Sequence, residues 1–307
     1  MSSITLKEIN YKNFGRCVEL SNGIVKVIVT VDVGPRIINY SFTDGENIFW
    51  EDIHRLETTD EVVDAYGSPW FLYGGHRLWT SPEASPRTYY ADNDPVEYTK
   101  IENGATFIQP VQKLNQVQCE ISVTLSPNSS DVKVSHKITN RNAWDITFAV
   151  WSLSVMSQGG LEVIPQPTRN TGYINNRIIG IWPYAKMTDS RICWGDRYVT
   201  MRQDPEIKSN YELGINSEHG FAMYFNHDEV FVKTFEIVEK GIYPDGGMSF
   251  ESYVSENFLE CESLSPLKTV APDEAIEHNE YWSLSKAEAP SDFDEVLFDV
   301  LSRKYVK

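Results

Sequence analysis

Hydrophobic and polar side chains alternate along much of the chain. From Cys119 to Leu125 every second residue is apolar, and after a turn at 126–128 the same alternation runs from Val132 to Thr139. Successive side chains of a β-strand point to opposite faces of its sheet. The pattern therefore predicts two antiparallel strands, each with one buried face and one solvated face.

Other segments extend this pattern. Val25 to Val31 alternates in the same way and is followed by a Gly34-Pro35 turn and a second apolar run at 36–42, which predicts an opening hairpin. From Asp145 to Met156 both parities are apolar, as in a strand that is buried on both faces. Further strands are expected at 191–201, 220–226, 229–238, 249–254, 257–263 and 276–285. Strands dominate, so the chain is predicted to be all-β.

A helix is predicted at the C-terminus, over about 291–306. Apolar residues from Phe293 to Tyr305 recur at helical spacing, and Ser291 is placed to cap the first turn. We expect this amphipathic helix to pack on the sheets as a lid; the alternative is an element that binds a partner. Because no glycine- or serine-rich linker divides the chain, residues 1–307 are expected to form a single domain.

Composition and charge narrow the range of partners. The 307 residues include 44 Asp and Glu against 27 Lys and Arg, a formal net charge of 27 − 44 = −17. Nucleic acid and anionic membranes need a basic face, so we expect neither as a partner.

The N-terminus has no signal-peptide core, and no stretch approaches the roughly 18 apolar residues of a spanning helix, which favours a cytoplasmic protein. The cysteines, Cys17, Cys119, Cys193 and Cys261, lack paired spacing, and we expect reduced thiols.

The longest stretch without a regular pattern, Glu51 to Asp94, contains a motif with candidate chemistry. After two glycines come His76, Arg77, Trp79 and, a few residues on, a glutamate. An imidazole, a fork-shaped donor, a stacking surface and a carboxylate suit a hydroxyl-rich ligand. The alternative is an aromatic loop that plugs one end of the sheets, with Arg77 in a salt bridge.

A second motif lies in the expected strand at 257–263. The period of two puts Phe258, Glu260 and Glu262 on one face. In a cleft, two carboxylates about 7 Å apart can raise each other's pKa towards that of a general base. On a solvated outer face the same pair would carry no chemistry.

Other polar residues have plainer interpretations beside the functional ones. Asp245 lies in a Pro-Asp-Gly-Gly turn and can cap its own backbone. His278 shares a strand face with Trp282, which fits a site wall or a packed core, and His136 is expected in the core. The sequence has no phosphate-binding, zinc-protease or serine-esterase motif, and its histidines have no metal-ligand spacing. We therefore expect no metal and no organic cofactor.

Taken in order, these segments resemble the galactose mutarotase-like superfamily, which includes the aldose 1-epimerases, and most closely a bacterial branch of it. The order and spacing of the parts carry the resemblance over most of the chain. These parts are Glu19–Ile24, Val33–Ile37, Gly74–Trp79, Trp151–Leu153, Gly159–Gly160, Pro165, Phe258–Glu260, Pro266, Val270–Glu274 and Glu280–Leu284. The resemblance implies an all-β fold, an antiparallel β-supersandwich with a short C-terminal helix.

The resemblance also implies roles for individual residues. In aldose 1-epimerases a glutamate takes the proton of the anomeric hydroxyl and a histidine protonates the ring oxygen, so the ring opens and closes as the other anomer. The matching glutamate is Glu260, with Glu262 as the shifted alternative, and Arg77 matches a sugar-binding arginine. The family's acid histidine has no counterpart at 149–153, so His76 is expected to supply the acid, with His278 as the alternative.

The sequence thus predicts a carbohydrate-binding isomerase that needs no metal or cofactor. Its expected catalytic residues are Glu260, His76 and Glu262, and its expected sugar-binding residues are Arg77, Trp79, Asp245 and His278. Two alternatives stay open: a catalytically silent sugar-binding module, and a lyase or hydrolase that uses the glutamate pair on the same scaffold.

Overall fold

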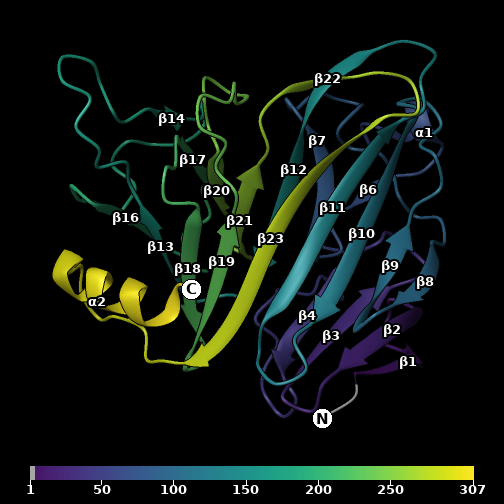
Figure 1. Ribbon diagram of the computed structural model, residues 1–307, viewed down its shortest axis with the longest axis horizontal. Coiled ribbons are helices and arrows are strands. Elements are labelled where there is room, and N and C mark those ends of the chain that lie inside the picture. The colour runs from purple at the N-terminus through teal and green to yellow at the C-terminus, as the bar shows by residue number, and fades with distance from the viewer. Residues whose placement is uncertain (1–3) are drawn as a thin grey trace.

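The computed structural model describes residues 4–307, and two large antiparallel sheets packed face to face make up most of it (Figure 1). The sheet of eleven strands is called sheet A, and the sheet of ten strands is called sheet B. Sheet A runs in the order β1 (Thr5–Asn10), β2 (Arg16–Ser21), β3 (Val25–Thr30), β4 (Ile37–Phe42), β7 (Gly75–Ser81), β12 (Ile146–Met156), β21 (Leu259–Leu264), β20 (Phe250–Val254), β17 (Tyr211–Ile215) and β14 (Ile179–Ile181), and β22 (Lys268–Val270) also pairs with β12.

Sheet B faces sheet A across the core. Its strands run in the order β15 (Ile192–Trp194), β16 (Tyr198–Arg202), β13 (Leu161–Pro165), β18 (Phe221–Asn226), β19 (Glu229–Phe235), β23 (Ala275–Lys286), β11 (Val132–Asn140), β10 (Val117–Leu125), β9 (Gly104–Ile108) and β8 (Glu97–Ile101). This architecture confirms the predicted antiparallel β-sandwich.

The period-two pattern builds the core as predicted. Along β10 the side chains of Cys119, Ile121 and Val123 are buried, and the polar residues between them are half-buried on the outer face. Strands β10 and β11 pair antiparallel, with Ile121 opposite His136. Every residue of β12 from 148 to 156 is buried, which confirms the strand covered on both faces.

Residues 51–94 contain more regular structure than the sequence analysis expected. Residues Gly75–Ser81 form β7, a strand of sheet A between β4 and β12. The same stretch holds a short helix, α1 (Val63–Tyr66), and a two-stranded sheet of β5 (Thr58–Thr59) and β6 (Trp70–Phe71). The motif at 73–83 is therefore a paired strand for most of its length and not a loop.

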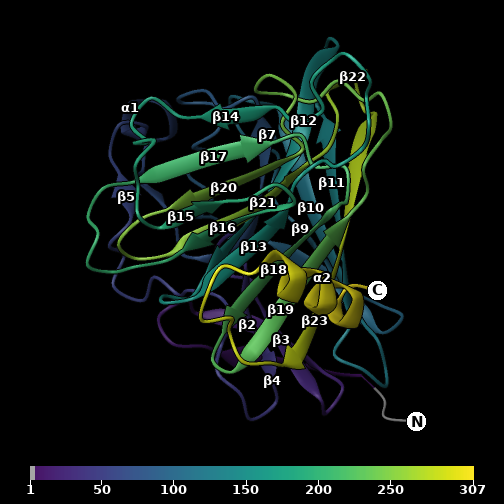
Figure 2. The ribbon, with the colours of Figure 1, turned by 90° about the vertical axis from the view of Figure 1, so that its left-hand side faces the viewer.

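The C-terminal helix, α2 (Glu295–Tyr305), lies across sheet B, as Figure 2 shows. It buries Phe298 and Tyr305 against apolar residues of β13, β18 and β19. Its cap is Asp294, whose side chain accepts hydrogen bonds from the backbone N–H groups of Val296 and Leu297. The expected cap at Ser291 is wrong, because the chain is still irregular there and the helix begins later than 291.

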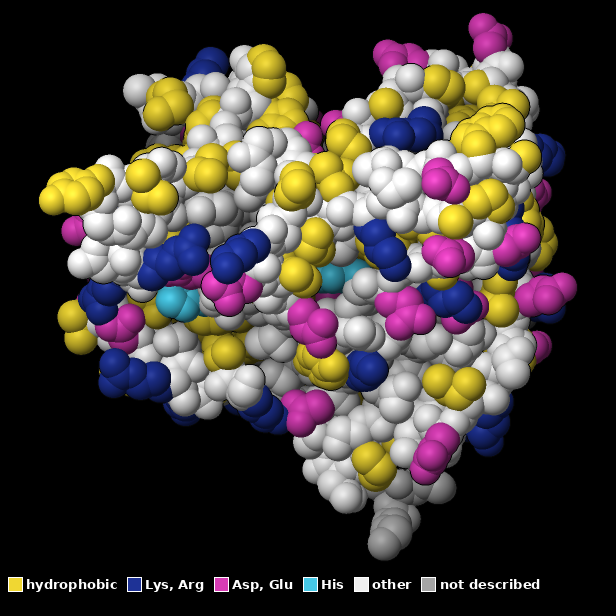
Figure 3. Space-filling view, turned by 45° about the horizontal axis from the view of Figure 1, so that its top comes forward, with side chains coloured by type: hydrophobic (Ala, Val, Ile, Leu, Met, Phe, Trp, Pro, Cys, Tyr) yellow, Lys and Arg dark blue, Asp and Glu magenta, His cyan; other side chains and the backbone are white. Residues whose placement is uncertain are grey.

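Charges on the surface are mixed. On the face drawn in Figure 3, Lys and Arg side chains lie among Asp and Glu and do not gather in one patch. Within residues 4–307, no helix is long and apolar enough to cross a membrane. Three of the free cysteines are buried, Cys17, Cys119 and Cys261, and Cys193 is exposed.

Candidate active site

A pocket of about 310 Å³ lies on the face of sheet A that points away from sheet B. Alternate residues of neighbouring strands build its floor. Arg77 of β7 stands opposite Leu153 of β12, which stands opposite Glu262 of β21. Tyr253 of β20 stands opposite both Glu260 of β21 and Glu212 of β17, so these side chains also share the outer face. The volume of the pocket is at the lower end of the range of about 300–1,000 Å³ for small-molecule sites.

The lining combines acidic and aromatic side chains. One basic residue, Arg77, is among the residues that line it. The acidic residues are Glu57, Glu83, Glu212, Glu260 and Glu262. The aromatic residues are Trp70, Trp79, Tyr89, Trp151, Trp182, Tyr184, Tyr253 and Phe258. Aromatic faces and polar groups together are typical of a pocket for a sugar-sized polar ligand.

Arg77 and Glu260 form a buried ion pair in this pocket. Arg77 Nη2 donates to Glu260 Oε1 at 3.3 Å, and the guanidinium lies 4.0 Å from the ring centre of Trp79. Burial raises the pKa of Glu260, and the positive charge of Arg77 opposes that rise. Two further nitrogens of Arg77, Nε and Nη1, are buried and have no partner in the part of the chain that the structure describes. An unpaired buried donor costs about 1–3 kcal/mol, so a ligand oxygen in the pocket would relieve this cost.

The other two buried glutamates favour the protonated form. Burial raises the pKa of Glu262 well above its usual range, and the negative charge of Glu260 raises it further. Trp151 Nε1 donates to Glu262 Oε2 at 2.6 Å, which leaves the other oxygen to carry a proton. Burial also raises the pKa of Glu212 to about 8. The pocket thus combines a carboxyl group held by a cation with carboxyl groups that retain their protons near neutral pH, and such a combination can exchange protons with a substrate.

The structure brings four of the seven predicted site residues together: Arg77, Trp79, Glu260 and Glu262 line the pocket. Asp245 does not line it; its carboxylate accepts a hydrogen bond from Ser81 Oγ at 3.2 Å.

His76 lies on the other face of sheet A because it neighbours Arg77 in a strand. Its imidazole is buried between the sheets and bonded to His136 Nε2 at 2.7 Å and Ser154 Oγ at 2.8 Å. Since His136 Nδ1 bonds a backbone carbonyl oxygen, that nitrogen carries the proton, and the N–H of His76 must donate to His136 Nε2. Burial lowers the pKa of His76 well below its usual range, so the ring is neutral. Neither ring nitrogen of His76 is placed to serve the pocket.

The same inter-sheet network contains His278, which bonds Ser263 Oγ at 2.7 Å. At its centre Glu280 accepts hydrogen bonds from Ser152 Oγ and from Trp282 Nε1, each at 2.7 Å, and pairs with Lys233 Nζ at 2.9 Å. His76, His136 and Glu280 bring possible metal-ligand atoms within 4.8 Å of one another. The two imidazoles bond each other directly, however, and the ammonium of Lys233 already neutralises the carboxylate. These contacts describe a hydrogen-bonded core.

Several pocket residues were missed by the sequence analysis. Glu212 is the charged residue of an otherwise uncharged strand, Tyr211–Ile215, and an isolated charge of that kind is the signal that could have found it. Trp151 and Leu153 could have been assigned to the pocket face from the parity of β12. Trp182 and Tyr184 follow β14 in an irregular segment where no periodicity exists.

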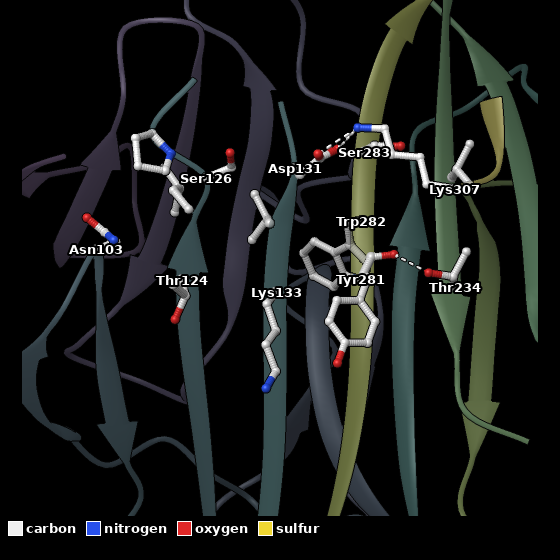
Figure 4. A pocket seen from close by; sticks show the side chains of 14 residues that line it. Asn103, Thr124, Ser126, Asp131, Lys133, Thr234, Tyr281, Trp282, Ser283 and Lys307 are labelled. Carbon is white, nitrogen blue, oxygen red and sulfur yellow. Dashed lines mark hydrogen bonds and ion pairs between the residues drawn. The ribbon is translucent and has the colours of Figure 1, made fainter. Parts of the chain in front are cut away.

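A larger hollow, of about 550 Å³, lies on the outer face of sheet B (Figure 4). One row of cross-strand neighbours, Thr124, Lys133, Tyr281 and Thr234, crosses it. Of the described residues that line it, only Asp131 is acidic, and Lys307 pairs with it. This hollow offers no pair of groups for acid–base chemistry, so the smaller pocket on sheet A is the stronger candidate.

Comparison with known proteins supports the fold. No family model matches the chain. No curated protein matches it in sequence. A galactose mutarotase-like protein from Lactobacillus casei ATCC 334 aligns over 88% of this chain and 100% of its own, with 12% identity and a TM-score of 0.57. A candidate aldose 1-epimerase from Klebsiella pneumoniae aligns over 94% of this chain and 82% of its own, with 11% identity and a TM-score of 0.58.

A third solved structure aligns with this chain over only part of its own length. A TPR-domain containing protein from Parabacteroides distasonis ATCC 8503 aligns over 90% of this chain and 48% of its own, with 12% identity and a TM-score of 0.61. Identities this low show the fold alone. The chain has a galactose mutarotase-like β-sandwich, as its sequence predicted.

Proposed function

We propose that the chain is an aldose 1-epimerase-like enzyme that interconverts sugar anomers in the pocket on sheet A. The observation that carries this proposal is that Glu260, paired with Arg77, and Glu262, whose pKa burial raises well above its usual range, lie in one aromatic-lined pocket. The fold is shared with a galactose mutarotase-like protein and a candidate aldose 1-epimerase, and this analogy supports sugar chemistry.

In this proposal Glu260 is the general base. It takes the proton of the anomeric hydroxyl, and the sugar ring opens as the ring oxygen accepts a proton. Rotation about the bond between C1 and C2 and closure in reverse then give the other anomer. Arg77 opposes the rise that burial causes in the pKa of Glu260, and its free N–H groups are available to bind a sugar oxygen.

Glu262 is the general acid in place of the histidine that the sequence analysis expected. Its raised pKa favours the protonated carboxyl group, as a donor requires. Residues two apart on one strand face are separated by about 7 Å, which lets the two carboxyl groups approach one sugar ring from either side. The predicted roles of His76 and His278 are replaced because both rings are bonded within the core.

The test is anomer exchange measured by NMR across a panel of aldoses. We expect the wild type to accelerate exchange and Glu260→Gln to slow it by about 10²–10⁴-fold, the usual contribution of a general base. Glu262→Gln should have a similar effect. The matched control is Glu97→Gln on the exposed part of β8, which removes the same charge outside the pocket and should exchange anomers like the wild type.

The pH dependence separates the two roles. Activity should fall at low pH as Glu260 becomes protonated and at high pH as Glu262 loses its proton, which gives a bell-shaped profile. If the Glu260→Gln protein exchanged anomers as fast as the wild type, Glu260 would not be the general base.

Strand geometry favours a second candidate, a glycoside hydrolase. Residues two apart along a strand are spaced about 7 Å apart, and inverting glycosidases hold their two carboxyl groups about 6.5–9.5 Å apart. A folded protein that accelerates no anomer exchange but releases reducing ends from glycosides would support the hydrolase. Binding of sugars without either reaction would support the silent sugar-binding module.

A further inference from the structure

The pocket carries an excess of acidic groups that anomer exchange does not require. Beyond Glu260 and Glu262, its lining includes Glu57, Glu83 and Glu212, and its single cation belongs to Arg77. That cation is paired with Glu260 and lies against the ring of Trp79. No other basic side chain is among the residues that line the pocket, so nothing there could neutralise a bound phosphate or carboxylate.

Glu212 is framed by aromatic residues. Tyr184 donates its hydroxyl hydrogen to Glu212 Oε2, and Tyr253 is its cross-strand neighbour on β20. Trp182 also lines the pocket, and its backbone N–H donates to the backbone oxygen of Glu212 at 3.4 Å. Carboxylates beside aromatic faces are the groups that proteins use to bind an organic ammonium, because the ring face attracts the cation and the carboxylate pairs with it.

Arg77 provides an independent sign that a polar ligand enters here. The residue is 2% exposed, yet Nε and Nη1 lack partners within residues 4–307. A sugar hydroxyl would satisfy these donors, while the acidic wall opposite would accept a positive group on the same ligand.

We propose that the pocket takes a cationic amino sugar, with its ammonium group at Glu212 and its hydroxyl groups at Arg77, and that it rejects phosphorylated and uronic sugars. This inference rests on the proposed function in that it names the sugar of the same pocket. Recognition of charge can nevertheless be measured without catalysis.

The charges around Glu212 make binding depend on protons. Tyr184 opposes the effect of burial, because its hydrogen bond to Glu212 lowers the pKa of that carboxyl group. The other groups that act on it are acidic: Glu83 follows β7, Asp245 lies before β20, Glu251 is on β20, and Glu260 and Glu262 are on β21. Burial and these neighbours raise the pKa of Glu212 to about 8, so it is mostly protonated at pH 7. A bound ammonium favours the carboxylate, and the complex should therefore release protons as it forms.

Isothermal titration calorimetry with D-glucosamine, D-glucose, D-glucose 6-phosphate and D-glucuronate tests the proposal. We expect glucosamine to bind at least about tenfold more tightly than glucose, in keeping with an ion pair plus a desolvated cation–π contact. The two anionic sugars should give no heat of binding. Repeating the glucosamine titration at pH 7 in buffers of different ionisation enthalpy should reveal proton release, which glucose should not cause.

Two variants separate the local effect from the overall negative charge. Glu212→Gln keeps the shape of the side chain, and it should bring glucosamine within about threefold of glucose and abolish the proton release. Glu97→Gln removes one charge outside the pocket and should keep the wild-type preference. Near-ultraviolet circular dichroism confirms that each variant is folded before titration.

The outcomes distinguish this inference from the proposed function. Binding of glucose 6-phosphate or glucuronate as tight as that of glucose, or glucosamine no tighter than glucose, would overturn the amino-sugar assignment even if anomers exchange. Tight glucosamine binding without anomer exchange would support the assignment and reject the epimerase. Absence of binding by all four sugars would overturn the amino-sugar assignment, and anomer exchange across the panel of aldoses would still decide the proposed function.

Discussion

Breaking the buried ion pair of Lys233 and Glu280, which lies between the two sheets, is expected to destabilise the fold strongly. Both side chains are fully buried, and Lys233 Nζ lies 2.9 Å from Glu280 Oε1. Lys233 also donates to the backbone oxygen of Cys261 at 2.8 Å. Lys233→Met keeps most of the side-chain volume and removes the cation, so the negative charge of Glu280 remains buried without its counter-ion.

The expected cost follows from this uncompensated charge. Removing one partner of a buried pair costs about 3–5 kcal/mol, a large share of the roughly 5–15 kcal/mol by which a domain is stable. Ser152, Ser263 and Trp282 still donate to Glu280 in the variant, which places the expected loss towards the lower end. The free energy of unfolding is measured by urea denaturation with tryptophan fluorescence at pH 7.

The pH dependence of this loss can be derived from Glu280. Burial alone would raise its pKa, but Lys233 and the neighbouring groups hold it well below its usual range in the folded wild type. That stabilisation is present above the unfolded pKa of about 4.3 and is lost as the pH falls through the folded value. Without Lys233, burial dominates and Glu280 can gain a proton in the fold, so the gap between variant and wild type should narrow as the pH falls from 7 to 5.

Two further variants make the reasoning refutable. Lys233→Met combined with Glu280→Gln removes both charges and should recover part of the loss. Lys133→Met, on the exposed face of β11, the strand next to β23, should change stability by no more than about 0.5 kcal/mol. A Lys233→Met protein within about 1 kcal/mol of the wild type at pH 7, or a double variant no more stable than the single one, would refute the role assigned to the pair.

Two predictions concern backbone and helix capping. Gly75→Ala should lower the melting temperature and cost more than about 1 kcal/mol, because Gly75 has φ +68° and an added Cβ would lie 2.4 Å from the backbone oxygen of Ile37; Gly23→Ala, which has no atom within 4 Å of its Cβ, should cost less. Asp294→Ala should cost about 0.5–2 kcal/mol through the lost cap of α2, and faster amide exchange confined to that helix would identify the cause; unchanged exchange there would contradict it.

Strands could be predicted from the sequence where one face meets water. Residues 119–125 and 132–139 alternate strictly because their outer faces are partly solvated, and both strands were found as expected. The same rule placed Glu260 and Glu262 on one face, and both line the pocket. Side chains alternate between the two faces of any strand. Two residues can therefore be assigned to one face once the segment is known to be a strand, whatever surrounds it.

The strand β7 was missed because neither of its faces is a uniform apolar surface. Arg77 and Trp79 face the pocket, while His76 and Leu78 face the core between the sheets. Polar groups therefore occur at both parities and the hydrophobic alternation disappears. Assigning His76 and Arg77 to one site ignored that neighbours in a strand point to opposite faces, and only the structure reveals that this segment is a strand.

Charges on the two sides of sheet A also act on each other electrostatically. The cation of Lys233, on the core side, lowers the pKa of Glu260 on the pocket side, in the same direction as Arg77 and against burial and the nearby glutamates. A buried ammonium behind the sheet thus opposes the rise that burial and the acidic pocket cause in the pKa of the proposed base. In a Lys233→Met protein that remains folded, the low-pH limb of anomer exchange should therefore move to higher pH, whereas Lys133→Met should leave it in place. An unmoved limb in folded Lys233→Met would show that sheet A insulates the pocket from the core, and that Arg77 is the cation that acts on the pKa of Glu260.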